Sequence, residues 1–170
     1  MRDNFDRCLA WLLESEGGFS NHADDPGGAT NLGVTLAAWG KFAGKPVTEA
    51  DIRALTPAAV VPFYKQAYWD RTKCDDLPSG VDYAMFDFAV NSGVNRAIRY
   101  AQSIVDVSQD GFFGPVTIAA IHATDPKWFV HRLCSARQRY LETLPTFRTF
   151  GRGWTKRVQT VAARAAEMAT

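Results

Sequence analysis

Residues 5–35 read FDRCLAWLLESEGGFSNHADDPGGATNLGVT, an apolar run that reaches a glutamate and continues into a glycine-rich loop. Apolar residues recur at helical spacing in the first eleven positions, with Phe5, Leu9 and Leu12 on one stripe. We therefore expect a first helix over residues 4–15. The glycines and the Asp-Pro-Gly-Gly turn that follow predict a loop or a short hairpin.

Glu16 stands at the junction between this helix and the loop. On a helical wheel it lies about 20° from Phe5 and Leu9, so it continues the buried stripe, whereas Glu14 faces solvent. The helix dipole and poor solvation both disfavour a charged carboxylate there, so stability alone would not select glutamate. A carboxyl group that keeps its proton near neutral pH can act as a general acid. The alternative is a frayed helix end with Glu16 turned to water.

Asp25 follows Glu16 by nine residues, and Thr30 follows it by fourteen. The intervening glycines let the chain fold back, which can bring a second carboxylate and a hydroxyl opposite Glu16. Glycoside hydrolysis needs an acid on the leaving oxygen and a carboxylate or a held water on the opposite face. The alternative for Asp25 is a plain turn in which its side chain caps backbone amides.

The composition is that of a globular protein. The chain has 170 residues, of which 46% are hydrophobic and 22% charged, so it can bury a core and is not disordered. No apolar run approaches the roughly 20 residues that cross a bilayer. The N-terminus does not resemble a secretory signal, so we expect the chain to stay where it is made unless it is released or exported.

Three cysteines and three histidines are scattered along the chain without metal-ligand spacing. They predict neither a disulfide framework nor a metal site. Between Lys127 and Arg164, nine basic residues stand against the single acid Glu142. This segment predicts either an ordinary solvated helix surface or a face for a polyanion.

Helical periodicity dominates the remaining sequence, and no convincing strand pattern occurs beyond the loop. We expect an all-α fold of two helical lobes, which meet near residues 91–95 and pack as one compact domain. Asp87 lies within an apolar helix and needs a partner, for which we expect an arginine of the C-terminal half. Helix starts are predicted at Thr35, Thr48, Thr56-Pro57, Asn95, Gly114-Pro115, Asp125-Pro126 and about Arg152.

The stretch ESEGGFSNHADDPGGATNLGVT closely resembles the signature of the family 108 glycoside hydrolases, which are lysozyme-like N-acetylmuramidases of phages and bacteria. The resemblance continues through YWDRTKCDDLP, FDFAVNSGVNRAIRYAQ, DGFFGPVTIAAI and FGRGWTKRV, nearly the whole chain. It implies a lysozyme-like fold with a catalytic lobe over residues 1–93. Residues 94–170 resemble the family's predicted peptidoglycan-binding region. Phe19 and Leu32 stand where tyrosine is common, and Thr30 lies one residue closer to Asp25 than in phage-type lysozymes.

The resemblance implies hydrolysis of the β-1,4 bond between N-acetylmuramic acid and N-acetylglucosamine. Glu16 would protonate the glycosidic oxygen, and Asp25 would stabilise the transition state or orient water with the help of Thr30. Aromatic rings suit sugar stacking, and amides and hydroxyls suit sugar hydroxyls and N-acetyl groups. The substrate-binding candidates are Asn31, Tyr64, Tyr68, Trp69, Asn91 and Ser92. For at least two of the three aromatic residues, packing in the core is the expected alternative.

Two other functions fit the same residues. A lytic transglycosylase can work with one acid, and a non-catalytic cell-wall-binding or export-assisting protein can keep the fold without activity. The basic C-terminal helices carry no nucleic-acid motif, so peptidoglycan is the expected partner. We expect no cofactor, no membrane insertion and a monomer. The protein would be made in the cytoplasm and reach the cell wall by release, by a holin, or by another export factor.

Overall fold

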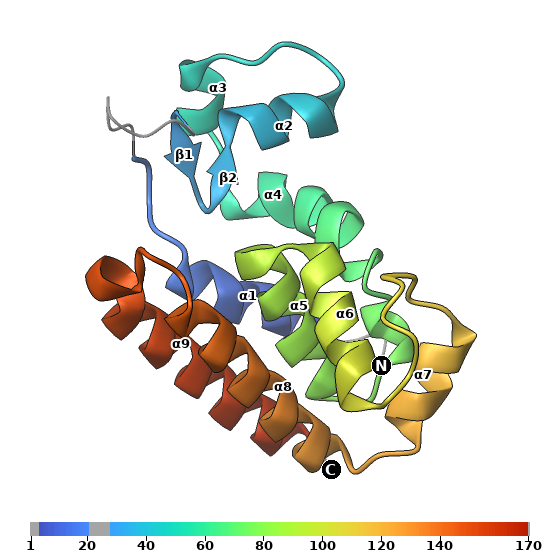
Figure 1. The fold of residues 1–170 in the computed structure, drawn as a ribbon. Helices are drawn as coiled ribbons and strands as arrows, with labels where there is room; N and C mark the ends of the chain where they lie inside the picture. The colour runs from blue at the N-terminus through green and yellow to red at the C-terminus, as the bar shows by residue number, and fades with distance from the viewer. Residues whose placement is uncertain (1–3, 21–27, 170) are drawn as a thin grey trace. The chain divides into compact units, whose positions relative to one another are not determined.

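The computed structural model describes residues 4–20 and 28–169 (Figure 1). Helices dominate these residues, so the fold is all-α, as predicted. No helix within the described ranges is both long and apolar enough to span a membrane. The α-helices and strands are α1 (Phe5–Ser15), β1 (Thr30–Asn31), β2 (Val34–Thr35), α2 (Leu36–Ala43), α3 (Glu49–Arg53), α4 (Pro57–Tyr64), α5 (Val81–Ser92), α6 (Val94–Ile104), α7 (Pro115–His122), α8 (Pro126–Glu142) and α9 (Phe147–Met168). A π-helical turn, η1 (Lys65–Trp69), follows α4, and a 3₁₀ turn, η2 (Cys74–Asp76), precedes α5.

The contacts divide the chain into two compact units. Residues 6–67 form the first unit, and residues 68–169 form the second together with residues 4–5. This division by contacts differs from the catalytic and peptidoglycan-binding regions expected over residues 1–93 and 94–170, which stay a prediction. Because α5 packs against α6, α8 and α9, it belongs with the C-terminal helices.

Side-chain caps account for several helix starts. Thr35 accepts a hydrogen bond from the Ala38 N–H at the start of α2, and Thr48 and Asp51 form the predicted capping box at α3. Thr56 caps α4, and Asp125 caps α8 by accepting from the Trp128 N–H. These predicted starts are confirmed.

The last helix begins at Phe147, so the predicted start at about Arg152 is wrong. Gly151 and Gly153 both lie inside the helix. Gly151 is buried, and a Cβ atom there would come within 2.8 Å of the Phe147 ring. The glycine therefore makes room for an aromatic ring and does not end a helix.

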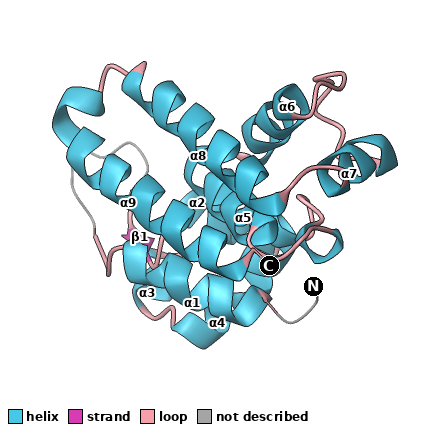
Figure 2. Ribbon diagram, turned by 90° about the horizontal axis from the view of Figure 1, so that it is seen from below, coloured by secondary structure: helices cyan, strands magenta, loops and turns pink. Residues whose placement is uncertain are grey.

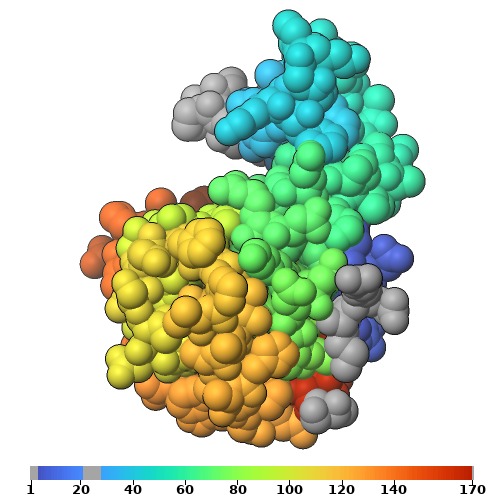
Figure 3. Space-filling model, turned by 90° about the vertical axis from the view of Figure 1, so that its right-hand side faces the viewer, coloured from blue at the N-terminus to red at the C-terminus, as the bar shows by residue number. Residues whose placement is uncertain are grey.

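The second unit is built around α5, whose first nine residues are all buried. Helices α8 and α9 run side by side against it (Figure 2). On the face shown in Figure 3, α6, the following loop and α7, coloured yellow to orange, form a continuous surface.

Asp87 lies at the centre of this unit and is completely buried. Arg137 of α8 donates to Asp87 Oδ1 over 2.6 Å, and Arg157 of α9 donates to Oδ2 over 2.9 Å. Burial acts to raise the pKa of Asp87, but the two arginine charges and their hydrogen bonds outweigh it, and the net pKa is lowered. The predicted arginine partner from the C-terminal half is confirmed, and three helices are linked through one carboxylate.

The first unit contains α2, α3, α4 and the strands. Trp39 and Phe42 of α2 pack against Phe63 of α4, with ring centroids 6.0 and 5.5 Å apart. Helix α3 packs against α2 and β1. Helix α2 also packs against β2, so the hairpin belongs to the same unit as this aromatic cluster.

Candidate active site

A two-residue hairpin follows the predicted glycine-rich loop. Strands β1 and β2 are antiparallel, with Thr30 opposite Thr35 and Asn31 opposite Val34. The two residues between them, Leu32 and Gly33, have φ angles of +50° and +74°. Positive φ at both central positions is the requirement of a type I′ turn, and it is unusual for a branched residue such as leucine. The short hairpin considered from the sequence is present, and its turn is at Leu32-Gly33.

The Glu16 carboxyl group lies against this turn. A Cβ atom built on Gly33 would lie 2.6 Å from Glu16 Oε2 and 2.6 Å from the Tyr64 hydroxyl oxygen. Glycine therefore leaves the space that these two polar groups occupy. The Glu16 side chain is half-buried whereas Glu14 is exposed, in agreement with the helical wheel.

The backbone holds Glu16 as an extension of α1. Its N–H donates to the carbonyls of Leu12 and Leu13 over 3.2 and 3.3 Å. The carboxyl group thus leaves from a regular helix end and is not carried on a free loop. A side chain on a regular element is positioned more accurately than one on a loop.

Tyr64 fixes the turn from the other side. The residue is fully buried, and its hydroxyl donates to the Leu32 carbonyl over 2.7 Å. Its ring packs edge-on against Phe63. A buried ring offers no face for sugar stacking, so Tyr64 packs in the core, the expected alternative for these aromatic residues, and its hydroxyl lies beside Glu16.

The chain that leaves Glu16 is fastened at two points. The Arg53 guanidinium lies 3.8 Å from the centre of the Phe19 ring, a close cation–π contact. Ser20 and Thr30 exchange two backbone hydrogen bonds of 2.8 Å. Phe19 and Ser20 are therefore anchored to Arg53 and to β1.

Gly17 and Gly18 have open space where a side chain would project, and neither has a positive φ angle. The backbone conformation at these two positions does not require glycine. The absence of side chains at these positions leaves the space next to the Glu16 backbone unfilled.

Thr30 and Asn31 belong to β1. The Thr30 hydroxyl has a long contact of 3.4 Å to the Gly28 carbonyl. Asn31 is buried, and its amide nitrogen donates to the carbonyls of Ile52, Arg53 and Leu55 over 3.0–3.3 Å. These bonds tie β1 to the end of α3, so the amide N–H groups of Asn31 are not available to a sugar.

Asp25, the second predicted carboxylate, lies outside the described residues. The remaining predicted contacts belong to the second unit. Trp69 is fully buried, packs against Phe5 and Phe86, and donates from its indole N–H to Asp75 over 2.9 Å. It is a core residue and presents no face to a sugar. Tyr68 is half-buried.

Asn91 and Ser92 end α5 and are half-buried, and the Ser92 hydroxyl donates to Asn91 Oδ1 over 3.0 Å. Ser92 also lines a pocket in the second unit. Both residues keep polar groups at the surface, and their sugar-binding role stays a prediction.

Sequence reasoning missed Gly33 and Arg53. Gly33 had a detectable signal, because a glycine directly before the β-favouring pair Val34-Thr35 is typical of a tight hairpin turn. Arg53 had none, because its contact with Phe19 joins residues 34 positions apart.

Comparison with known proteins agrees with these features. The family described as Glycosyl hydrolase 108 matches residues 9–93, and the family described as Predicted Peptidoglycan domain matches residues 96–159. A solved structure of Brucella abortus SagA superposes with a TM-score of 0.92 at 41% sequence identity, covering 99% of this chain and 97% of that chain. Comparison with curated protein sequences gave no match.

Proposed function

The chain belongs to the family 108 glycosyl hydrolases and is a glycoside hydrolase that acts on peptidoglycan, and from this premise we propose that it is an N-acetylmuramidase with Glu16 as its general acid. It would cleave the β-1,4 bond between N-acetylmuramic acid and N-acetylglucosamine. The observation that carries the proposal is the placement of the half-buried Glu16 carboxyl at a helix end, against Gly33 and the Tyr64 hydroxyl.

This placement suits proton transfer because it fixes the acid without enclosing it. Glu16 is held by α1 on one side and by the hairpin turn on the other, while open space lies beside Gly17 and Gly18. A rigid acid next to open space can meet a glycosidic oxygen at hydrogen-bonding distance.

In the proposed reaction, Glu16 donates its proton to the glycosidic oxygen as the bond to the anomeric carbon breaks. The positive charge that develops on the sugar ring needs a carboxylate or an oriented water on the opposite face. We assign that role to Asp25, with the Thr30 hydroxyl as its aid. Hydrolysis then adds water at the anomeric carbon and returns the proton to Glu16.

Lytic transglycosylation is the second candidate, because it needs only one acid and uses the 6-hydroxyl of the muramic acid as the nucleophile. The products separate the two reactions. Hydrolysis by a muramidase leaves N-acetylmuramic acid at the reducing ends of the fragments, whereas transglycosylation leaves 1,6-anhydro ends. Reducing N-acetylglucosamine ends would contradict both assignments.

The deciding experiment is mass spectrometry of the fragments that the purified protein releases from purified peptidoglycan. A Glu16→Gln sample treated in parallel serves as the control for contaminating hydrolases. We expect reducing muramic acid ends with the wild type and no fragments with the variant.

We also propose that the protein acts on the wall as a monomer after release or export, by a holin or another export factor. Light scattering at working concentration tests the oligomeric state. Fractionation of producing cells, with and without a co-expressed holin, tests the route.

A further inference from the structure

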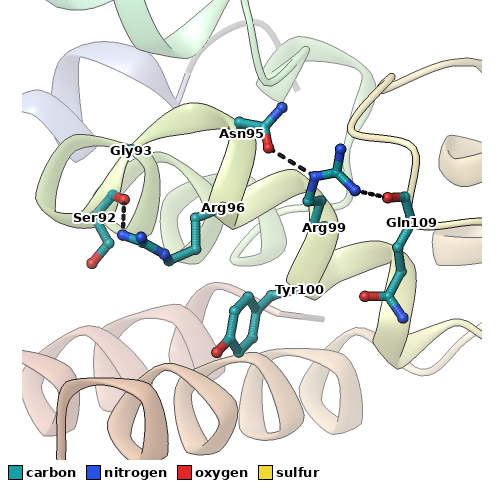
Figure 4. Close-up of a pocket in the computed structure, with 7 residues that line it drawn as sticks. All are labelled: Ser92, Gly93, Asn95, Arg96, Arg99, Tyr100 and Gln109. Atoms are coloured by element: carbon teal, nitrogen blue, oxygen red, sulfur yellow. Dashed lines mark hydrogen bonds between the residues drawn. The ribbon is translucent and has the colours of Figure 1, made fainter. Parts of the chain in front are cut away.

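A pocket of about 490 Å³ opens beside the first turns of α6, within the second unit (Figure 4). Its walls include Ser92, Asn95, Arg96, Arg99, Tyr100 and Gln109. The two arginines come from successive turns of one helix, and no acidic residue lines the pocket among the residues described. The pocket lies where the match to the peptidoglycan domain begins.

Arg96 is exposed but fixed in orientation. Its Nη1 donates to the Ser92 carbonyl over 2.7 Å, and its guanidinium lies 4.2 Å from the centre of the Tyr140 ring. Figure 4 shows the side chain turned toward Ser92. These contacts hold the group in place and do not neutralise its charge.

Arg99 is held by three neutral acceptors. Its Nε donates to Asn95 Oδ1 over 2.8 Å, and its two terminal nitrogens donate to the carbonyls of Gln109 and Asp110. Neither Arg99 nor Arg96 forms an ion pair with a carboxylate in the described parts of the chain.

Asp110 directly follows the pocket-lining Gln109 in sequence, and its carboxylate already accepts hydrogen bonds. Its Oδ1 accepts from the Phe112 N–H over 2.8 Å and from Gln102 over 2.7 Å. Those two bonds, with a smaller contribution from the Arg99 charge, lower the pKa of Asp110. The carboxylate thus supports the loop.

Stability alone does not explain two arginines in this position. Like charges one helical turn apart repel each other, and the N-cap of α6 is Gly93, which has no side chain to offset the positive end of the helix dipole. The local potential favours an anion. Arginine forks match carboxylates in geometry and charge.

We propose that this pocket binds the free carboxylate groups of the peptidoglycan stem peptide. The inference rests on the proposed function, since it takes peptidoglycan as the substrate. In a strand that carries its stem peptides, the lactyl carboxyl group of each muramic acid is amide-linked to the peptide, so the free carboxylates belong to the peptide. The pocket exceeds what a single small anion fills and falls in the size range of small-molecule sites, so it can receive part of a short peptide.

The test is a titration of the isotope-labelled full chain with a synthetic stem tetrapeptide, followed by NMR. We expect saturable shifts of the Gly93, Asn95 and Gln109 amide signals. The same peptide with its carboxylates amidated should shift these signals weakly. Equal shifts with both peptides, or none with either, would overturn the proposal. Inorganic phosphate that binds more tightly than the peptide would also overturn it, by assigning the pocket to phosphate.

Arg96→Gln and the double variant Arg96→Gln/Arg99→Gln test the residues. We expect the Kd for the peptide to rise at least about tenfold in the double variant, the scale of one lost charge-assisted contact. The single variant guards against loss of folding, because Arg96 is exposed and its hydrogen bond to the Ser92 carbonyl lies at the surface. Lys127→Gln/Arg132→Gln removes the same charge from exposed positions on α8 outside the pocket and should leave the Kd unchanged.

Cleavage of a peptide-free glycan whose muramic acid carboxyl groups are amidated, so that it carries no free carboxylate, separates this proposal from the proposed function. The Arg96 and Arg99 variants should cleave that substrate at the wild-type rate while losing the peptide. A wild type that binds the peptide but cleaves no glycan would contradict the muramidase assignment and leave the pocket assignment supported. An equal loss of peptide binding in the α8 control variant would overturn the pocket assignment.

Discussion

The Glu16 carboxyl group occupies the place that a side chain at Gly33 would take, because a Cβ atom there would lie 2.6 Å from Glu16 Oε2. We therefore expect Gly33→Ala to displace the carboxyl and to strain a backbone with φ of +74°. Turnover on purified peptidoglycan should fall at least about tenfold, since a misplaced acid loses its alignment. Assays of wall clearing, with circular dichroism as the folding check, measure this effect.

Gly17→Ala is the matched control for Gly33→Ala. A Cβ at position 17 meets nothing within 4 Å, and the φ angle there is not positive. Folding and turnover should both stay close to wild type. Equal losses in the two alanine variants would show that general flexibility of the loop matters, and not the contact between Glu16 and Gly33.

Glu16→Gln should leave folding nearly unchanged and lower turnover at least about a hundredfold, the usual scale for one general acid. The amide keeps the size of the side chain but cannot donate the proton that the leaving oxygen requires. Glu14→Gln is the neighbouring control, because Glu14 is exposed on the same helix. Similar losses in both variants, or full activity in Glu16→Gln, would refute the role of Glu16.

Tyr64→Phe should affect both stability and turnover. It removes the hydroxyl that donates to the Leu32 carbonyl over 2.7 Å, next to Glu16. The lost hydrogen bond should cost about 1 kcal/mol in the free energy of unfolding. If Tyr64 positions the turn, kcat should fall while KM for a soluble oligosaccharide changes little. A rise in KM alone would instead indicate a direct contact with the substrate.

The sequence predicted those parts of the fold and the site that depend on local chemistry. Glu16 continues the apolar stripe of Phe5 and Leu9, so a helical wheel is sufficient to predict its partial burial. Thr48 and Asp51 are three residues apart, so the spacing of a capping box is sufficient to predict the start of α3. The contacts that hold the site join distant segments. Tyr64 reaches Leu32 across 32 positions, and no local pattern separates such a tyrosine from one that stacks on a sugar.

The error at the last helix has the same origin. Glycine has a low helix propensity, yet Gly151 and Gly153 lie inside the helix, and the Phe147 ring packs against Gly151. Tertiary packing thus outweighed local propensity.

Asp87 should make stability depend on pH in the acid range. Its pKa is lowered in the folded state, so the stabilisation is fully present above the unfolded value of about 3.9 and is lost as pH falls through the folded value. Asp87→Asn breaks a buried ion pair and should cost about 3–5 kcal/mol at pH 7. Urea unfolding from pH 7 to pH 3 should show the difference between wild type and variant shrinking below about pH 4. Glu167→Gln, which changes an exposed acid on α9, should show no such trend.

The basic C-terminal segment should tether the enzyme to the anionic wall, but with fewer residues than its sequence suggests. Arg137 and Arg157 are committed to Asp87, whereas Arg148, Arg152 and Lys156 of α9 are exposed. Contacts between exposed charges weaken as salt rises, because the Debye length is about 8–10 Å near physiological salt and shorter above it.

Replacing Arg148, Arg152 and Lys156 together with glutamine should therefore reduce co-sedimentation with purified walls at low salt. The difference from wild type should shrink at high salt. Cleavage of a short soluble oligosaccharide should hardly change, since a tether for the wall does not take part in breaking the bond. Equal losses on walls and on the soluble substrate, with the fold intact by circular dichroism, would mean that these side chains contribute to the active site and do not form a separate tether.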